Sequence, residues 1–365
     1  MSVYKNILVV NLGGIGDAVI SIPFLRNLKR SFPRARVTAL VSKRASEVLK
    51  GIPYIDEVIP YDLQGLRWMD AVLHSESFFA AIRFLFNLRK RGFDLAVNLQ
   101  PHTSFVSAVK MAVVFYTIGA RVKAGRDTMG RGFFYQIKAY ESSISEVYET
   151  EIQKRLLEGI GGHGWKMELE LSVHPEDDAF VCELLRREGV GEEMPLVAIN
   201  PGSDYPTKRW PVENFIKVVE GLSQTYPLRF LVVGSNGERP LGLRIKGMVP
   251  EVVVLSGETT LGQLAALLKR VSLFITNDTG PMHMALALKV PTIAICGGPS
   301  FHKGFFPPDI QNAVVIRKDV DCSPCLKRRC DEMKCLKLIE PGEVVDAASA
   351  LLTLPSPQKV VVSDQ

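Results

Sequence analysis

Four loops of the 365-residue chain hold side chains whose types and spacing could do chemistry. The first is NLGGIGD at positions 11–17, which follows an apolar run and leads into an apolar helix. Gly13, Gly14 and Gly16 would let the backbone approach a ligand closely, and they leave Asp17 at the helix start as a candidate general base. Asp17 could equally be a first-turn acid favoured by the helix dipole. The glycine spacing fits neither the dinucleotide fingerprint nor the phosphate loop.

The second loop is NPGSDYPTKRWP at positions 200–211. It ends a buried strand and enters a helix at Pro211, a residue type favoured at the first helical position. Two adjacent cations and several hydroxyls, among them Lys208 and Ser203, would suit a diphosphate, with Lys208 acting as a point charge. The alternative is a solvated loop with Trp210 packed beneath it.

The third loop lies in FITNDTGPMHMA at positions 274–285. A strand ends at Asn277 and a helix begins just after it, so free backbone N–H groups and the positive end of the helix dipole would form an anion site. His283 on the first turn could bond a phosphate or a sugar, or could be an ordinary packing residue. The candidate residues of this loop are Asp278, Thr279, Gly280, Pro281 and His283.

The fourth loop is VVGSNGE at positions 232–238. Its glycines and Glu238 could hold a ribose, because a carboxylate accepts hydrogen bonds from ribose hydroxyls. A plain surface turn is equally consistent with this stretch.

Alternating elements would position these loops. Short β-branched runs alternate with amphipathic helical stretches, which is typical of βαβ units with parallel sheets. The expected strands span residues 7–11, 36–41, 94–99, 196–200, 228–234, 252–255, 273–277 and 292–296. Open α/β sheets bind ligands at the carboxyl ends of their strands, where all four loops lie.

We therefore predict an α/β fold with two similar domains that face each other across a cleft. A glycine-rich stretch within residues 159–173 marks the boundary, which gives domains 1–165 and 166–365. The last helix could return to the N-terminal domain.

The composition excludes several classes of protein. With 47% hydrophobic and 8% aromatic residues, the chain can bury proper cores and is neither disordered nor fibrous. The net charge of +5 is mild, but residues 1–150 hold 20 basic and 12 acidic side chains, whereas the rest hold 24 and 27. We expect no secretion signal and no spanning helix, and the sparse cysteines predict a reducing cytoplasm.

Two further stretches allow more than one interpretation. The cluster at residues 322–335 offers four thiolates, but only its first pair has zinc-knuckle spacing, so free thiols are preferred to a structural metal. Its members are Cys322, Cys325, Cys330 and Cys335. The run 78–93 is apolar with a basic end, and a helix packed on the sheet is preferred to one that dips into a membrane surface.

The chain resembles the bacterial heptosyltransferases of glycosyltransferase family 9, which build the inner core of lipopolysaccharide. The resemblance runs nearly end to end, through ILVVNLGGIGDAVISIPFLRNLKRSFP, RGFDLAVNLQ, NPGSDYPTKRWPVENF, FLVVGSNGE and LFITNDTGPMHMALALKVPTIAICGGPS. The combination of the D-T-G-x-x-H turn, the K-x-W-P loop and the N-terminal G-D is specific, although each alone would be weak.

The resemblance implies a GT-B fold, with an N-terminal acceptor domain and a C-terminal nucleotide-sugar domain, and an inverting transfer that needs no metal or cofactor. The implied substrates are ADP-heptose and a lipopolysaccharide core acceptor at the cytoplasmic face of the inner membrane. The enzyme would be cytoplasmic, with peripheral attachment to that membrane left open, and would bind no nucleic acid. The basic first half would suit such an anionic acceptor.

The resemblance also assigns residues by position. Asp17 would be the general base, in an acceptor loop made of Gly13, Gly14 and Gly16. The donor would be contacted by Ser203, Lys208, Glu238, Asp278, Thr279, Gly280, Pro281 and His283. Other functions stay open: a GT-B enzyme with another nucleotide-sugar donor, a nucleotide-sugar epimerase, or a non-enzymatic nucleotide-binding or sugar-binding module.

Overall fold

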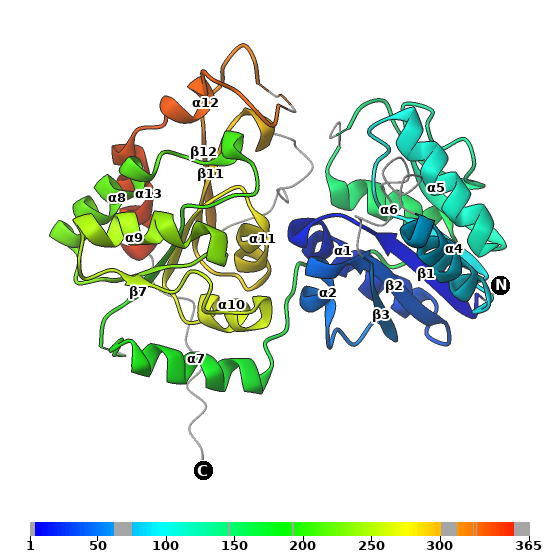
Figure 1. The fold of residues 1–365 in the computed structure, drawn as a ribbon, viewed down its shortest axis with the longest axis horizontal. Helices are drawn as coiled ribbons and strands as arrows, with labels where there is room; N and C mark the ends of the chain where they lie inside the picture. Colours follow the sequence, from blue (N-terminus) through cyan, green and yellow to red (C-terminus); the bar gives the residue numbers. More distant parts are fainter. Residues whose placement is uncertain are drawn as a thin grey trace. The chain divides into compact units, whose positions relative to one another are not determined.

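The structure, a computed structural model, describes residues 4–61, 75–144, 147–191, 193–300, 312–323, 325 and 327–353. These residues fall into two compact units, which meet in the sequence between Ser172 and Val173 (Figure 1). Each unit is built on a six-stranded parallel sheet with helices packed against it. The α/β fold class predicted from the alternating pattern is confirmed.

The first sheet has the strand order β3-β2-β1-β4-β5-β6. Its strands are β1 (Asn6–Asn11), β2 (Arg36–Ser42), β3 (Glu57–Tyr61), β4 (Leu95–Asn98), β5 (Val122–Thr128) and β6 (Ile137–Glu141). The side chains of the central strand β1 alternate between the two faces, because successive residues of a strand point to opposite sides. Ile7 joins one buried apolar cluster, and its neighbour Leu8 joins another.

Two groups of helices cover these two faces. The Ile7 face is covered by α1 (Ile15–Ser31), α2 (Lys43–Leu49) and α6 (Glu149–Gly159). The Leu8 face is covered by α4 (Ser75–Arg89) and α5 (Phe105–Ile118).

The second sheet has the order β12-β11-β10-β7-β8-β9, which repeats the topology of the first. In both, the first strand is central, the next two lie to one side of it and the last three to the other. The strands are β7 (Leu196–Asn200), β8 (Arg229–Val232), β9 (Val253–Val254), β10 (Leu273–Asn277), β11 (Thr292–Cys296) and β12 (Ala313–Arg317).

The second unit also has helices around its sheet. They are α7 (Pro175–Arg187), α8 (Val212–Thr225), α9 (Arg239–Met248), α10 (Leu261–Leu268), α11 (Gly280–Ala287), α12 (Lys334–Lys337) and α13 (Pro341–Thr353). Helix α7 packs against α10. Short 3-10 turns follow three of the strands: η2 (Pro206–Lys208), η3 (Asn236–Glu238) and η4 (Gly298–Ser300). Phe215 of α8, Ile245 of α9 and Val344 of α13 pack into one buried cluster against one face of the sheet.

The two units divide after Ser172, which lies inside the glycine-rich stretch 159–173 but beyond the predicted division after residue 165. The intervening segment stays with the first unit because α1 holds it. The Asn27 side chain accepts a hydrogen bond from the Lys166 N–H at 3.1 Å and donates one to the Lys166 carbonyl at 3.0 Å. Helix α13, the last helix described, packs against α8 of the second unit and does not return to the first.

Candidate active site

The predicted site residues lie at the carboxyl edges of the two sheets. In each sheet the strand order reverses once, between β1 and β4 and between β7 and β10, and open α/β sheets bind ligands at such points. Asp17 follows β1 in the first unit. Lys208 follows β7, Asp278 follows β10 and Glu238 follows the neighbouring strand β8. The candidate residues of each unit therefore lie at the carboxyl edge of its sheet.

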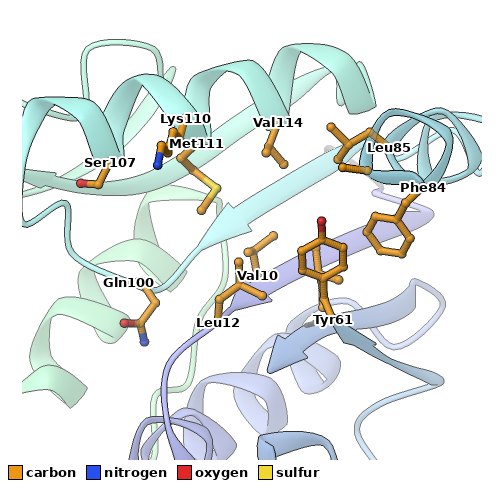
Figure 2. A pocket seen from close by; sticks show the side chains of 12 residues that line it. Val10, Leu12, Tyr61, Phe84, Leu85, Gln100, Ser107, Lys110, Met111 and Val114 are labelled. Atoms are coloured by element: carbon orange, nitrogen blue, oxygen red, sulfur yellow. The ribbon is translucent and has the colours of Figure 1, made fainter. Parts of the chain in front are cut away.

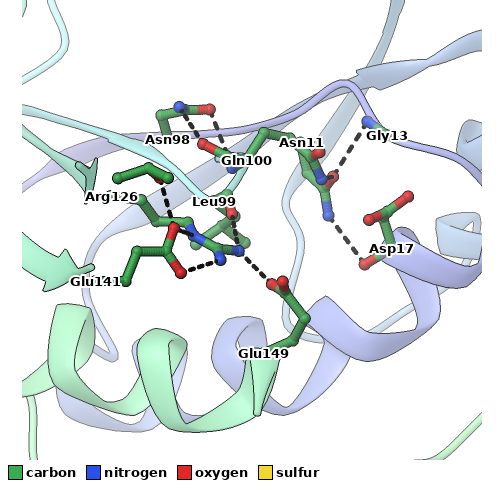
Figure 3. Close-up of polar contacts among 10 residues, drawn as sticks. Asn11, Gly13, Asp17, Asn98, Leu99, Gln100, Arg126, Glu141 and Glu149 are labelled. Carbon is green, nitrogen blue, oxygen red and sulfur yellow. Dashed lines mark hydrogen bonds and ion pairs between the residues drawn. The ribbon is translucent and has the colours of Figure 1, made fainter. Parts of the chain in front are cut away.

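Asp17 lies on the first turn of α1, whose N-cap is Gly14. Its Oδ2 accepts a hydrogen bond from the Gly14 N–H at 2.7 Å, which satisfies a donor that the helix itself leaves unpaired. The Asn11 side chain fastens the turn: Nδ2 donates to the Asp17 carbonyl at 3.0 Å, and Oδ1 accepts from the Gly13 N–H at 3.3 Å (Figure 3). Asp17 is therefore an acidic residue of the first turn of α1. The same hydrogen bonds fix the position of its carboxylate.

Gly13 is the loop glycine whose missing side chain makes room for that carboxylate. A Cβ at Gly13 would lie 2.5 Å from Asp17 Cγ, far inside van der Waals contact. A Cβ at Gly14 would lie 3.6 Å from Asp17 Oδ2, which is an ordinary contact.

A buried ion-pair network, which the sequence analysis missed, lies beside Asp17 (Figure 3). Arg126 on β5 is bidentate to Glu141 of β6, through Nε at 3.1 Å and Nη2 at 2.7 Å, and its Nη1 pairs with Glu149 at the start of α6. The Arg126 and Glu141 side chains are 1% and 0% exposed. Burial raises the pKa of Glu149, the Arg126 guanidinium lowers it, and the Asp17 and Glu141 carboxylates raise it further. The Arg126 guanidinium thus forms ion pairs with two carboxylates, those of Glu141 and Glu149.

A narrow polar recess opens next to Asp17. The residues that line it are Asn11, Asp17, Ile20, Leu99, Gln100, Glu149 and Gln153. Gln100 Nε2 donates to Asn11 Oδ1 at 2.7 Å, which ties the end of β4 to the end of β1. Two carboxylates and three amides line the recess, but they leave no room for a water molecule, so it is a packed polar cluster beside Asp17.

A larger cavity of about 310 Å³ lies between α4, α5 and the carboxyl ends of β1 and β2 (Figure 2). Its wall is mostly apolar, with the rings of Tyr61 and Phe84 4.6 Å apart, and Lys110 is the one charged residue among the described side chains that line it. Gln100 borders both this cavity and the recess. No motif predicted the cavity, because its wall consists of ordinary core-type residues from several elements.

In the second unit, Lys208 and Asp278 form an ion pair, with Nζ 2.7 Å from Oδ2. Their side chains are only 22% and 6% exposed. Lys208 ends η2 and Asp278 directly follows β10, so the pair bridges two loops from neighbouring strands. Asp278 therefore holds a cation at the carboxyl edge of the sheet.

The loop that carries Lys208 is anchored along its length. Asn277 donates from Nδ2 to the Pro201 carbonyl at 2.9 Å and accepts from the Trp210 N–H at 3.1 Å. The Trp210 indole is buried and donates to the Ile339 carbonyl at 3.2 Å. Ser203 is buried as well. Trp210 thus packs beneath the loop, as the alternative interpretation of this stretch predicts. The loop above it is nevertheless fixed by hydrogen bonds to Asn277.

The third loop leads into α11, with Thr279 as the N-cap and Gly280 and Pro281 opening the helix. Asn200 Nδ2 donates to Thr279 Oγ1 at 3.3 Å, which connects this helix start to the end of β7. His283 is 4% exposed, and its Nε2 lies 4.0 Å from Asp278 Oδ1. The helix start, the histidine and the Lys208 pair therefore converge.

Glu238 closes the same edge from the side of β8. Its Oε2 accepts from the Ser235 N–H at 2.7 Å and from the Ser235 hydroxyl at 2.8 Å. The carboxylate reaches Gly202, where an added Cβ would lie 2.0 Å from Oε1.

We expect Gly202→Ala to displace Glu238 and break its bonds to Ser235, which lowers the free energy of unfolding by about 1–2 kcal/mol. Urea denaturation measures this change. Gly237→Ala is the matched control in the same region, because its Cβ would meet only Ser235 Oγ at 3.9 Å. Equal midpoints for the two variants would contradict the predicted clash.

The four C-terminal cysteines are free thiols: Cys322 is exposed, Cys325 and Cys330 are half-buried, and Cys335 is buried. Across the described ranges, no three His, Cys, Asp or Glu side chains gather closely enough to hold a metal ion. Two of the thiols lie near η4: the Cys325 N–H donates to the Gly298 carbonyl at 3.1 Å, and a Cβ added at Gly298 would lie 3.3 Å from Cys325 Sγ and 3.7 Å from Cys335 Sγ.

Helix α4, within the apolar run at 78–93, packs into the first unit. Leu85 and Leu88 are buried against α5, whereas Phe79 and Phe86 are exposed. The side chain of Phe78 lies outside the described residues. In the part of the chain that the structure describes, no helix has both the length and the apolar character to cross a bilayer.

Known proteins match this arrangement over most of the chain. The family model described as Glycosyltransferase family 9 (heptosyltransferase) matches residues 81–336. Lipooligosaccharide heptosyltransferase 2 of Campylobacter jejuni is 33% identical over 345 residues, which are 93% of this chain and 95% of the relative.

Solved structures share the fold. A glycosyl transferase family 9 protein from Veillonella parvula has a TM-score of 0.74 at 24% identity, over 96% of this chain and 97% of that one. The ADP-heptose lps heptosyltransferase II of Escherichia coli has a TM-score of 0.69 at 21% identity, over 95% and 98%. The family match and the relative at 33% identity establish that the chain belongs to glycosyltransferase family 9 and is a glycosyltransferase.

Proposed function

We propose that this enzyme transfers heptose from ADP-heptose to a sugar of the lipopolysaccharide inner core, with inversion at the anomeric carbon and without a metal. The proposal rests on two groups of residues in this family 9 chain, one at the carboxyl edge of each sheet. One sheet edge presents Asp17, whose carboxylate is fixed at the start of α1, and the other presents a lysine held by an ion pair beside a helix start. The names of two relatives, lipooligosaccharide heptosyltransferase 2 and ADP-heptose lps heptosyltransferase II, support the donor and the acceptor class.

In the proposed reaction, Asp17 is the general base. Its carboxylate takes the proton of the acceptor hydroxyl while that oxygen attacks the anomeric carbon from the face opposite the diphosphate. The new C–O bond forms as the bond to the diphosphate breaks, and ADP leaves with the electron pair. The fastened turn around Asn11 and Gly14 keeps the carboxylate in place, so it need not reorganise during the step.

The second unit would stabilise the charge that develops on the leaving ADP. Lys208 supplies a positive charge, and the start of α11 supplies N–H groups and the positive end of its dipole. Asp278 orients the ammonium through the 2.7 Å ion pair. Thr279, Gly280, Pro281 and His283 then border the diphosphate, with Ser203 beside it and Glu238 as the ribose partner.

The proposal also states where the enzyme meets its acceptor and which molecules it requires. The acceptor would be reached at the cytoplasmic face of the inner membrane, where the excess of basic side chains in residues 1–150 favours an anionic glycolipid. No cofactor is required, and the nucleotide sugar is a substrate.

The direct test is transfer from ADP-heptose to a deacylated core oligosaccharide in the presence of EDTA. We expect ADP release in equal amount to the heptosylated product, with an inverted linkage by NMR. A requirement for a divalent metal would overturn metal independence, and preference for a UDP or GDP sugar would overturn the donor. Isomerisation of the donor without acceptor would point to an epimerase.

We expect Lys208→Met to weaken ADP binding by about tenfold to a hundredfold, because it removes a charge-assisted contact to the diphosphate. Calorimetric titration with ADP measures this change. Lys217→Met on α8 is the control, since Lys217 is an exposed lysine of the same unit. A Kd within twofold of the wild-type value would remove Lys208 from the donor site.

A further inference from the structure

Helix α5 is apolar on the side that faces solvent as well as on the side that faces the sheet. Its inner side packs on the sheet through buried residues such as Ala108 and Phe115. Its exposed side chains recur at i, i+4, i+8 and i+11, with one more beside the first, so they lie within about 100° of the helix circumference. They are Phe105, Val106, Val109, Val113 and Tyr116, and each is between 39% and 65% exposed. These five residues, here called the α5 face, include no charged side chain.

The α5 face is a continuous apolar patch. Single apolar side chains are common on protein surfaces, but a helix packed on a sheet normally turns polar residues to solvent. Phe133, which is 50% exposed, extends the patch, because its ring stacks on that of Phe105 with the centroids 5.7 Å apart. The described part of the chain leaves this patch uncovered, and such patches mark surfaces that bind another molecule or a membrane.

The chain around the α5 face is strongly basic. Residues 79–133 contain nine Lys and Arg side chains, two Asp and no Glu. The two acids are Asp94, which accepts a hydrogen bond from the Lys5 N–H at 2.8 Å, and Asp127, which accepts one from the Gly132 N–H at 2.7 Å. The excess of cations favours an anionic partner for this surface.

Two of these cations are fixed at opposite ends of α5. Arg131 donates from Nη1 to the His102 carbonyl at 2.9 Å, just before the helix begins. Arg89, an exposed residue at the end of α4, donates from Nη1 to the Thr117 carbonyl at 3.1 Å, in the last turn of α5. Lys110 is the one charged residue of α5 itself. An apolar stripe with basic side chains at its margins is typical of a helix that lies in the interface of an anionic bilayer.

The same charges disfavour a second copy of the chain as the partner. A symmetric dimer would place each α5 face on its twin and bring Arg89 and Arg131 toward the same cations of the other copy. An anionic bilayer instead supplies an apolar layer for the valine and phenylalanine side chains and, above it, phosphates for the arginines.

The position of the α5 face fits a role beside the candidate base. Helix α5 follows β4, and the loop that carries Phe133 follows β5, so both begin at the carboxyl edge of the first sheet (Figure 1). Asp17, which follows β1, lies at this edge too. Contact of the α5 face with a bilayer therefore brings the edge that carries Asp17 to the membrane.

We propose that the α5 face, together with Phe133, binds the first unit to the surface of an anionic lipid bilayer. The apolar side chains enter the boundary between headgroups and acyl chains, and Arg89 and Arg131 contact headgroup phosphates. The inference rests on the proposed function for its role, which is to bring Asp17 to a lipid-linked acceptor. The binding itself is tested on vesicles that contain no acceptor.

Cosedimentation of the full chain with phosphatidylcholine vesicles, with and without phosphatidylglycerol, tests the proposal. We expect binding to the anionic vesicles that weakens as salt is added. Val109→Glu combined with Val113→Glu should raise the lipid concentration for half-maximal binding roughly tenfold or more, because two carboxylates would have to enter the apolar layer. Leu243→Glu combined with Met248→Glu is the matched control, since it adds the same charge at exposed apolar positions of α9. It should bind like the wild-type protein.

Phe105→Trp locates the contact without weakening it. The emission of the added indole should shift to shorter wavelength when anionic vesicles are added, and acyl chains labelled with bromine should quench it. Phe180→Trp on α7, where Phe180 is 40% exposed, should show neither effect. This measurement does not depend on the folding of the glutamate variant.

Three outcomes would overturn the proposal. They are equal vesicle binding by the wild-type protein and the α5 glutamate variant, an equal loss in the α9 control, and a dimer that the α5 glutamates dissociate while no vesicles are bound.

Transfer to the deacylated oligosaccharide separates this inference from the proposed function, because that acceptor needs no membrane. Vesicle binding without transfer would overturn only the proposed function. Transfer without vesicle binding would overturn only the α5 face as a membrane surface.

Discussion

Asp17→Asn is expected to lower kcat for heptosyl transfer by about a hundredfold to ten-thousandfold while leaving the Kd of ADP unchanged. The amide cannot take the acceptor proton. It keeps an oxygen that can accept the Gly14 N–H bond, so the start of α1 stays intact. Initial rates of ADP release measure the first effect, and calorimetry measures the second.

Asp17→Ala provides the comparison that separates chemistry from structure. This variant also removes the bond to Gly14, so we expect it to lose about 1 kcal/mol of unfolding free energy in addition to its activity. Near-normal transfer by Asp17→Asn would show that another group is the base, whatever the stability of the alanine variant.

Arg126→Met is expected to destabilise the first unit by about 3–5 kcal/mol, the largest stability effect among these variants. The change leaves Glu141 and Glu149 buried without the cation that both contact. Equilibrium unfolding in urea, followed by a probe in the first unit, measures the loss.

The pH dependence and a second substitution check the cause. In Arg126→Met, burial raises the pKa of Glu149 above its unfolded value without a cation to lower it, so folding is favoured while this carboxyl is protonated and disfavoured as pH rises through the raised pKa. The deficit should therefore grow from pH 5 to pH 8. Adding Glu141→Gln should recover part of it. A deficit that is independent of pH would mean that lost packing, and not unpaired charge, is responsible.

The central strands could be predicted because β1, β7 and β10 are continuous apolar runs buried on both faces. The strands that the sequence analysis did not anticipate are β3, β5, β6 and β12. β5 was missed because it buries Arg126, and a buried charge is not expected within a strand. The free-energy cost of burying this charge is offset by ion pairs with Glu141 and Glu149. Both partners lie outside β5, so the residues of the strand alone do not reveal them.

Some features of the candidate site could likewise be predicted from the sequence, and others could not. The loops that follow apolar strands could be found from the rule that places ligands at carboxyl strand ends. The pairing of Lys208 with Asp278 could not, because it joins residues 70 positions apart and depends on β7 lying next to β10.

All six strands of the first sheet come from residues 6–141, and all six of the second come from residues 196–317. During synthesis, the first sheet can therefore assemble on the ribosome before the first strand of the second has been made, because domains fold as units in the order in which they emerge. Arg126, Glu141 and Glu149 are all available by then, so this buried ion-pair network can form before the second unit exists.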